Sequence, residues 1–149
     1  MPTLRDASMV DAWVAEDATF ADAARALAAS GIPAVAVLAG GNRVVGLFTE
    51  TNLIAGLVPA YVRELRHTAF AEDDLEALAR RGGEAAGEPV ARHLSRPVVL
   101  EIDTSATHAA ERFLHGDCGA AAVVERGRFV GMLSRVELAR LLLARAGIG

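Results

Sequence analysis

The sequence contains no lysine and only one cysteine, Cys118. One cysteine cannot form a disulfide within the chain, which excludes a small secreted fold held together by disulfides. All 15 basic residues are arginine, and 19 acidic residues leave a formal net charge of −4. A mildly acidic chain lacks the basic surface that a non-specific nucleic-acid binder requires. We therefore expect no nucleic-acid partner.

Long apolar runs are also missing, although 52% of the 149 residues are hydrophobic. That fraction is enough for a buried core and excludes intrinsic disorder as the main state. The longest apolar candidate, Leu141-Leu142-Leu143-Ala144, lies between Arg140 and Arg145, whereas a membrane helix needs about 20 apolar residues. The N-terminus carries no apolar signal segment. We therefore predict a soluble, cytoplasmic protein without a membrane partner.

The chain does contain an internal repeat. At a shift of about 86 residues, identical residues coincide in the two halves: Asp17 with Asp103, Ala36-Val37 with Ala122-Val123 and, after a turn one residue shorter, Val45-Gly46 with Val130-Gly131. We predict a first repeat over residues 1–58, a helical linker over 59–89 and a second repeat over 90–149.

Both copies predict the same order of elements. Thr19 and Ser105 are suited to be N-caps of a first amphipathic helix. A short apolar run follows, which is typical of a strand buried on both faces, and then a hairpin turn and a second strand. The expected strands are 34–38, 44–48, 120–124 and 129–133, and extended segments at 10–14 and 97–100 precede them.

A second helix is predicted to begin after Thr49 in one copy and after Ser134 in the other. Its apolar face is expected to carry Leu53, Ile54 and Leu57, or Leu138, Leu141 and Leu142. The unit is therefore β-α-β-β-α, and the fold class is α/β (α+β). Helical spacing in the linker, first at Tyr61, Val62 and Leu65 and then at Leu75 and Leu78, indicates helices packed against the pair.

Four short segments carry a resemblance to a known family. The sequences GLFTETN at residues 46–52 and GMLSRVE at 131–137 match a glycine–apolar–apolar–Ser/Thr–x–x–Asp signature. The sequences GIPAV at 31–35 and VARHLS at 90–95 are similar to the turn before the second strand and to the first motif of the same family. The chain thus resembles two cystathionine-beta-synthase (CBS) domains in tandem, a stand-alone Bateman module.

This resemblance implies a pseudo-twofold pair with two clefts that bind AMP, ADP, ATP or S-adenosylmethionine as a regulatory ligand, and no required cofactor. In the family the Ser/Thr approaches phosphate or ribose and the acidic residue binds the ribose. Matching positions imply one site at Thr49, Asn52, Pro97, Val98 and Cys118, and another at Ser134, Arg135, Glu137, Asp11, Ala12 and Ile32. The resemblance also implies a homodimer that regulates an unidentified partner protein and is not an enzyme.

The residue types support the same location. A hydroxyl at a strand-to-helix junction lies beside backbone amides at the positive end of a helix, which favours an anion. Gly46 and Gly131 are expected to let the backbone approach a ligand closely.

A ligand-independent homodimerisation or scaffold module with decayed sites is the alternative. The signature aspartate is replaced by Asn52 and Glu137, and the Ser134-x-x-Glu137 pattern is itself a capping box. Thr49 can likewise serve only as a cap. Apart from Arg135 and Arg96, the basic residues that would neutralise phosphates are missing, so few phosphates are expected on any ligand. Surplus apolar residues on the last helix suggest a partner helix in a homodimer.

Three further features have simpler explanations than a special site. His108, Glu111 and His115 share one helix face, but this is the polar face of that helix and not a metal site. Cys118 follows His115 closely, but a lone cysteine at the start of a strand is usually a small buried residue and not a nucleophile. Trp13 lies near the first extended segment, where two roles are open to it: covering an adenine ring or packing in the core. We favour the core, because buried aromatic residues mostly serve to bury apolar area.

Overall fold

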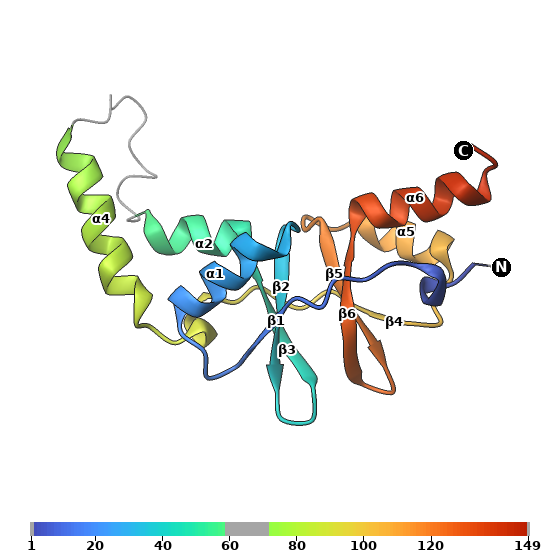
Figure 1. The fold of residues 1–149 in the computed structure, drawn as a ribbon, viewed down its shortest axis with the longest axis horizontal. Coiled ribbons are helices and arrows are strands. Elements are labelled where there is room, and N and C mark those ends of the chain that lie inside the picture. The colour runs from blue at the N-terminus through green and yellow to red at the C-terminus, as the bar shows by residue number, and fades with distance from the viewer. Residues whose placement is uncertain (1, 59–71, 149) are drawn as a thin grey trace.

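The computed structural model describes residues 2–58 and 72–148, and two similar halves lie side by side in it (Figure 1). The first half contains β1 (Trp13–Ala15), α1 (Phe20–Ser30), β2 (Ala34–Ala39), β3 (Arg43–Thr49) and α2 (Glu50–Leu57). The second contains β4 (Val99–Glu101), α5 (Ala106–Leu114), β5 (Ala120–Glu125), β6 (Arg128–Ser134) and α6 (Arg135–Arg145). The 3-10 helices η1 (Leu4–Asp6) and η2 (Val90–His93) precede the two halves, and α4 (Glu72–Ala86) lies between them.

Both halves have the same sheet topology. The strand orders are β1-β2-β3 and β4-β5-β6, with a parallel first pair and an antiparallel second pair in each sheet. Even the irregularity in register recurs, between Val37 and Leu38 and between Val123 and Val124. The predicted fold class of two β-α-β-β-α repeats is confirmed.

Local sequence chemistry accounts for these elements. The Thr19 hydroxyl accepts a hydrogen bond from the Asp22 amide at 3.2 Å, and the Asp22 carboxylate accepts one from the Thr19 amide at 3.3 Å. This reciprocal cap begins α1, and Gly31, with φ of 71°, ends it in the left-handed conformation. The hairpins turn at Asn42 and Arg126, each followed or preceded by a glycine and each with a positive φ.

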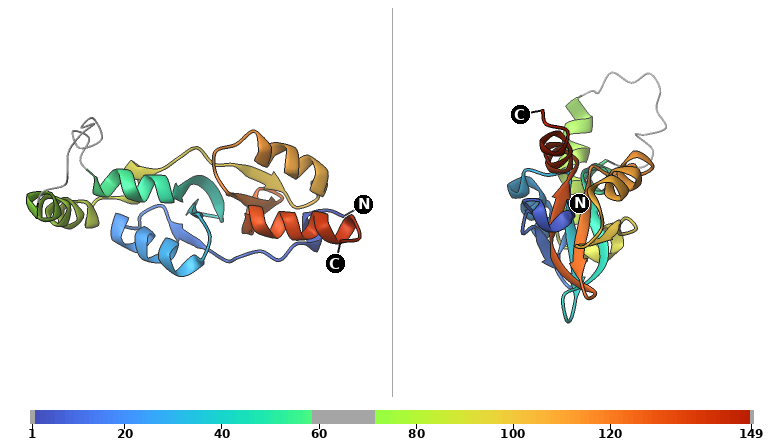
Figure 2. Two further views of the ribbon diagram at one scale, coloured as in Figure 1. Left: turned by 90° about the horizontal axis from the view of Figure 1, so that it is seen from above. Right: turned by 90° about the vertical axis from the view of Figure 1, so that its right-hand side faces the viewer.

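The segments that precede the strands are exchanged between the halves. We call residues 3–10 and 89–95 the leading segments. Leu4 is fully buried in the core of the second half, whereas Val90 is fully buried in the core of the first. In Figures 1 and 2 the chain starts beside α6 and then runs across to β1. The segment that precedes the first half therefore completes the core of the second half, and the segment that precedes the second half completes the core of the first.

Each leading segment is fixed by a pair of backbone hydrogen bonds. Val10 and Met132 exchange bonds of 2.9 and 2.8 Å, and Ser95 and Leu47 exchange bonds of 2.9 and 3.1 Å. Both bridges are antiparallel and join a leading segment to the edge of β6 or β3. The bridges extend each sheet with residues from the other side of the pseudo-twofold axis.

The signature glycines make room for this crossing. A Cβ on Gly131 would lie 2.6 Å from the Cβ of Met9, and one on Gly46 would lie 2.8 Å from Cδ1 of Leu94. Two carbon atoms that are not bonded to each other cannot lie this close. The missing side chains of Gly46 and Gly131 therefore make room for the leading segments; the close approach of a ligand to their backbone stays a prediction.

Helix α4 packs against α1 and α2 of the first half. The Arg81 guanidinium donates from Nε to the Gly56 carbonyl at 3.0 Å and lies 3.3 Å from the Glu88 carboxylate. The residues predicted as the earlier part of the linker helix, Tyr61, Val62 and Leu65, lie outside the described part of the chain. Within that part, no helix is long and apolar enough to cross a membrane.

A polar cluster joins the linker to the second leading segment. His93 Nε2 lies 2.8 Å from Glu88 Oε2, and the His93 ring packs edge-on against Phe20 with centroids 4.7 Å apart. The hydrogen bond with His93, aided by the charges of Arg81 and Arg92, lowers the pKa of Glu88 below its ordinary value.

Two side chains predicted to pack inward are exposed instead. Trp13 is 45% exposed because β1 is an edge strand in which only the central residue, Val14, faces the core. Ile54 is 60% exposed, whereas Leu53 and Leu57, one turn apart on α2, pack against the core. The predictions of a core Trp13 and an inward Ile54 are wrong.

Candidate ligand-binding site

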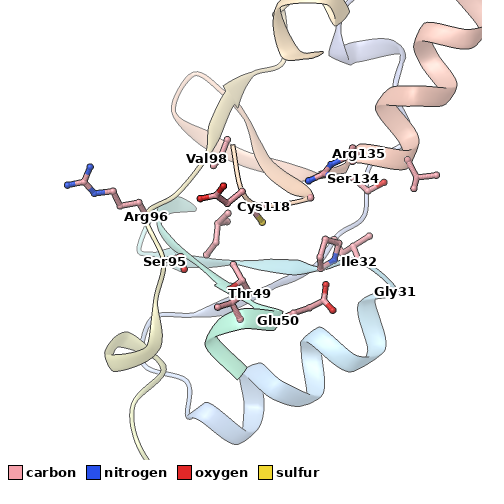
Figure 3. Close-up of a pocket in the computed structure, with 16 residues that line it drawn as sticks. Gly31, Ile32, Thr49, Glu50, Ser95, Arg96, Val98, Cys118, Ser134 and Arg135 are labelled. Carbon is pink, nitrogen blue, oxygen red and sulfur yellow. The ribbon is translucent and has the colours of Figure 1, made fainter. Parts of the chain in front are cut away.

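A cavity of about 950 Å³ opens between the two halves where β3 leads into α2 and β6 leads into α6 (Figure 3). The N-termini of both helices reach it from opposite sides. Two equivalent backbone hydrogen bonds hold these junctions: the Glu50 amide donates to the Pro33 carbonyl at 3.0 Å, and the Arg135 amide donates to the Gly119 carbonyl at 2.8 Å. The cavity therefore lies between equivalent junctions of the two repeats.

Thr49 and Ser134 both line the cavity and both cap the helix that follows. The Asn52 amide donates to the Thr49 hydroxyl, and the Glu137 amide donates to the Ser134 hydroxyl, each at 3.1 Å. The capping interpretation is thus correct for both hydroxyls. Capping does not exclude a ligand, since both residues also line the cavity.

The residues at the position of the signature aspartate do not line the cavity. Asn52 Oδ1 accepts three hydrogen bonds, from the amide and the hydroxyl of Thr49, each at 2.9 Å, and from the Ser95 hydroxyl at 3.1 Å. A carbonyl oxygen has two lone pairs, so no capacity remains there for a ribose hydroxyl.

Glu137 behaves differently from the predicted capping box. Its Oε1 accepts a hydrogen bond from the Ser8 amide at 3.0 Å, and Oε2 lies 3.5 Å from Arg140 Nη1. The longer side chain reaches past the Ser134 amide to the first leading segment, so the expected return bond to Ser134 is not formed. Glu137 therefore anchors an exchanged segment.

The structure combines the two predicted sites into one. Six of the predicted residues line the cavity together: Ile32, Thr49, Val98, Cys118, Ser134 and Arg135. Besides Asn52 and Glu137, the other predicted residues do not line it: Asp11 and Pro97 are exposed elsewhere, and Ala12 is buried in the core of the first half. The sequence predicts two separate clefts, whereas the hydroxyl residues Thr49 and Ser134 of both predicted sites line the same cavity.

Several lining residues were not in the predicted sites. Glu50, Thr51, Asp117 and Ser95 contribute polar groups, and Leu47 and Pro33 contribute apolar ones. The sequence could have indicated Glu50 as a site residue, because it occupies the position in the first repeat that the predicted site residue Arg135 occupies in the second. The sequence could not have indicated Ser95, because only the exchange of leading segments brings this residue next to β3.

Charges in the cavity are balanced but unevenly placed. Figure 3 shows the Arg135 guanidinium and the Glu50 carboxylate directed into the cavity from opposite halves, whereas the Arg96 side chain points away. The guanidinium lies over Gly119, where an added Cβ would be 3.7 Å from Nη2. Neither Glu50 nor Arg135 forms an ion pair with a described residue.

The residues weighed for metal binding and nucleophilic chemistry form no such site in the described ranges. No group of three His, Cys, Asp or Glu side chains is placed to hold a metal ion there. His108 Nδ1 and Glu111 Oε2 are 3.9 Å apart on an exposed helix face, and His115 lies beyond the end of α5. Cys118 is half-buried.

The family model described as "CBS domain" matches residues 6–58 and 90–144, which together make up most of the chain. The chain belongs to the CBS domain family. Each matched segment contains one of the two repeats, so the protein is a tandem CBS pair.

Solved structures of other CBS proteins have the same fold. A CBS-pair protein from Arabidopsis thaliana is 19% identical over 97% of this chain and 96% of its own, with a TM-score of 0.75. A CBS domain-containing protein of unknown function from Bacillus anthracis is also 19% identical, over 97% and 95%, with a TM-score of 0.74. One from Kribbella flavida is 19% identical over 96% and 99%, with a TM-score of 0.72. No curated protein matches the sequence.

Proposed function

We propose that this CBS pair is a regulatory module that binds an adenosine-type ligand, such as AMP, ADP, ATP or S-adenosylmethionine, in the cavity between its repeats. The observation that carries the proposal is the cavity itself, with a volume of about 950 Å³. Ligand sites typically occupy roughly 300–1,000 Å³ and combine apolar walls with a few convergent polar groups. Here Leu47, Ile32 and Val98 supply the walls.

The polar groups support recognition and not catalysis. Two helix N-termini and two hydroxyls favour an anionic or hydroxylated ligand. No histidine is among the described residues that line the cavity, so no imidazole there is placed to activate Cys118. The proposed role is therefore to report ligand occupancy to a partner protein through differential affinity for two conformations.

A ligand-independent scaffold is the second candidate, and two observations favour it. Asn52 and Glu137 use their oxygens in internal hydrogen bonds. In addition, α5 and α6 enclose an apolar groove of about 380 Å³ that is lined by the exposed Leu114, and Val136 and Leu143 on α6 are exposed as well. Exposed apolar residues around a groove are typical of a contact with another chain, and we propose a second copy of this chain.

Thermal unfolding with AMP, ADP, ATP, S-adenosylmethionine, NAD and adenosine separates the two candidates. A ligand at 100 times its Kd stabilises the folded state by about 2.7 kcal/mol, equivalent to about 5–10 °C in Tm. A shift with one adenosine compound supports the regulatory module. If a folded dimer shows no shift with any of them, the scaffold replaces it.

A further inference from the structure

Glu50 and Arg135 occupy equivalent positions in the two repeats but carry opposite charges. Each is the first residue of its helix, directly after the capping hydroxyl of Thr49 or Ser134. Each donates its backbone amide to the residue that precedes the second strand of its own repeat: Glu50 to the Pro33 carbonyl and Arg135 to the Gly119 carbonyl. The two helix starts that border the cavity are thus equivalent in backbone, whereas their charges are opposite.

Both charges are available to a ligand. Their side chains point into the cavity from opposite halves (Figure 3), and neither forms an ion pair with a described residue. Two further charged residues line the cavity: Asp117, and Arg96, whose side chain points away from it (Figure 3). Glu50 and Arg135 therefore place one negative and one positive charge at the two helix starts that border the cavity.

We infer that the cavity holds one ligand per chain in a single orientation, with an anionic group on Arg135 and an amino group on Glu50. This inference rests on the proposed function and specifies its ligand class. AMP and S-adenosylmethionine share the required chemistry, an anionic group together with an amino group. ATP fits less well, because the single inward arginine would have to neutralise a triphosphate. The carboxylates of Glu50 and Asp117, which line the same cavity, would repel it.

A charge exchange tests the orientation. Titration calorimetry with AMP and with S-adenosylmethionine is expected to give one site per chain for at least one of them, and weaker binding of ATP. Arg135→Glu or Glu50→Arg alone should weaken that binding tenfold or more, about the effect of one charge-assisted hydrogen bond. The double variant should recover affinity relative to either single reversal, because it exchanges the two charges between equivalent helix starts and so again offers one positive and one negative group.

Matched controls reverse a charge outside the cavity. Arg112→Glu and Glu16→Arg change exposed residues that form no ion pair with a described residue, and they should leave affinity unchanged. Thermal unfolding of each variant confirms that it is folded. Two sites per chain, tighter binding of ATP, single reversals without effect, or a double variant that does not recover would overturn this inference while leaving ligand binding intact. Failure of the wild-type protein to bind any probe would overturn the proposed function and this inference together.

Discussion

Replacing Gly131 with alanine tests whether the signature glycine serves the crossing of the leading segment. The new Cβ would lie 2.6 Å from Met9 Cβ and 3.4 Å from Met9 Sδ. Sulfur at the end of a flexible side chain can move away, but Cβ is fixed to the backbone. The leading segment would have to shift by about 1 Å to restore ordinary carbon contact, against the two hydrogen bonds between Val10 and Met132.

The expected cost follows from two opposing terms. Overpacking of this kind destabilises by about 1–3 kcal/mol. Reduced freedom of the unfolded chain returns about 0.4–1 kcal/mol when glycine becomes alanine. We therefore expect Gly131→Ala to lower the free energy of unfolding by about 1–2 kcal/mol, or Tm by about 3–8 °C, as measured by urea and thermal unfolding followed by circular dichroism.

Gly40→Ala is the matched control, because a Cβ there meets nothing within 4 Å. It should change stability by less than about 0.5 kcal/mol. Met9→Gly removes the obstructing atom, so the double variant with Gly131→Ala should show a coupling of about 1 kcal/mol or more, whereas Met9→Ala should show little. The reasoning is refuted if Gly131→Ala is as stable as the wild type, or if Met9→Ala relieves it as well as Met9→Gly.

Three further changes have expected outcomes. Leu4→Ala should cost about 2–5 kcal/mol and speed amide exchange chiefly in the second repeat, whose core contains Leu4; equal effects in both repeats would contradict the exchange. Ser134→Ala should cost about 1 kcal/mol in urea unfolding through loss of the bond from the Glu137 amide, and no loss would mean that the cap is idle. The hydrogen bond with His93, aided by Arg81, lowers the pKa of Glu88 in the folded state. The unfolded chain therefore binds that proton more readily, and the free energy of unfolding falls as the pH drops through the ordinary glutamate range. Glu88→Gln should flatten this dependence of the free energy of unfolding on pH, whereas an unchanged dependence would contradict the Glu88–His93 interaction.

The sequence predicts the elements well because their causes are local. Thr19, Thr49, Ser105 and Ser134 each cap a helix within three residues, and the apolar runs that form β2 and β5 are buried along almost their whole length. Duplication strengthens each of these signals, since two weak patterns at one spacing are far less often accidental. Fold class and element order therefore followed from residues near each other in the chain.

The candidate site was less predictable because its geometry depends on contacts between the repeats. Ser95 reaches Asn52, and Ser8 reaches Glu137, only after the leading segments have crossed. Those contacts decide which oxygens remain for a ligand. Trp13 illustrates the same limit, because an aromatic residue beside Val14 looks like core until the strand is known to lie at an edge.

The crossing also limits how a ligand can act. If the repeats separated, Leu4 and Val90 would leave the cores in which both are fully buried, at a cost of about 1.5–3 kcal/mol for each side chain. Four backbone hydrogen bonds between the leading segments and β3 or β6 would break as well. A ligand can shift an equilibrium only by its differential affinity for the two states. Movements of α2 and α6, whose first residues border the cavity, would leave these four backbone bonds intact and, among the bonds to the leading segments, strain only those from Ser95 to Asn52 and from Ser8 to Glu137. If the pair binds a ligand as proposed, a signal along those helices would therefore cost less than opening the pair.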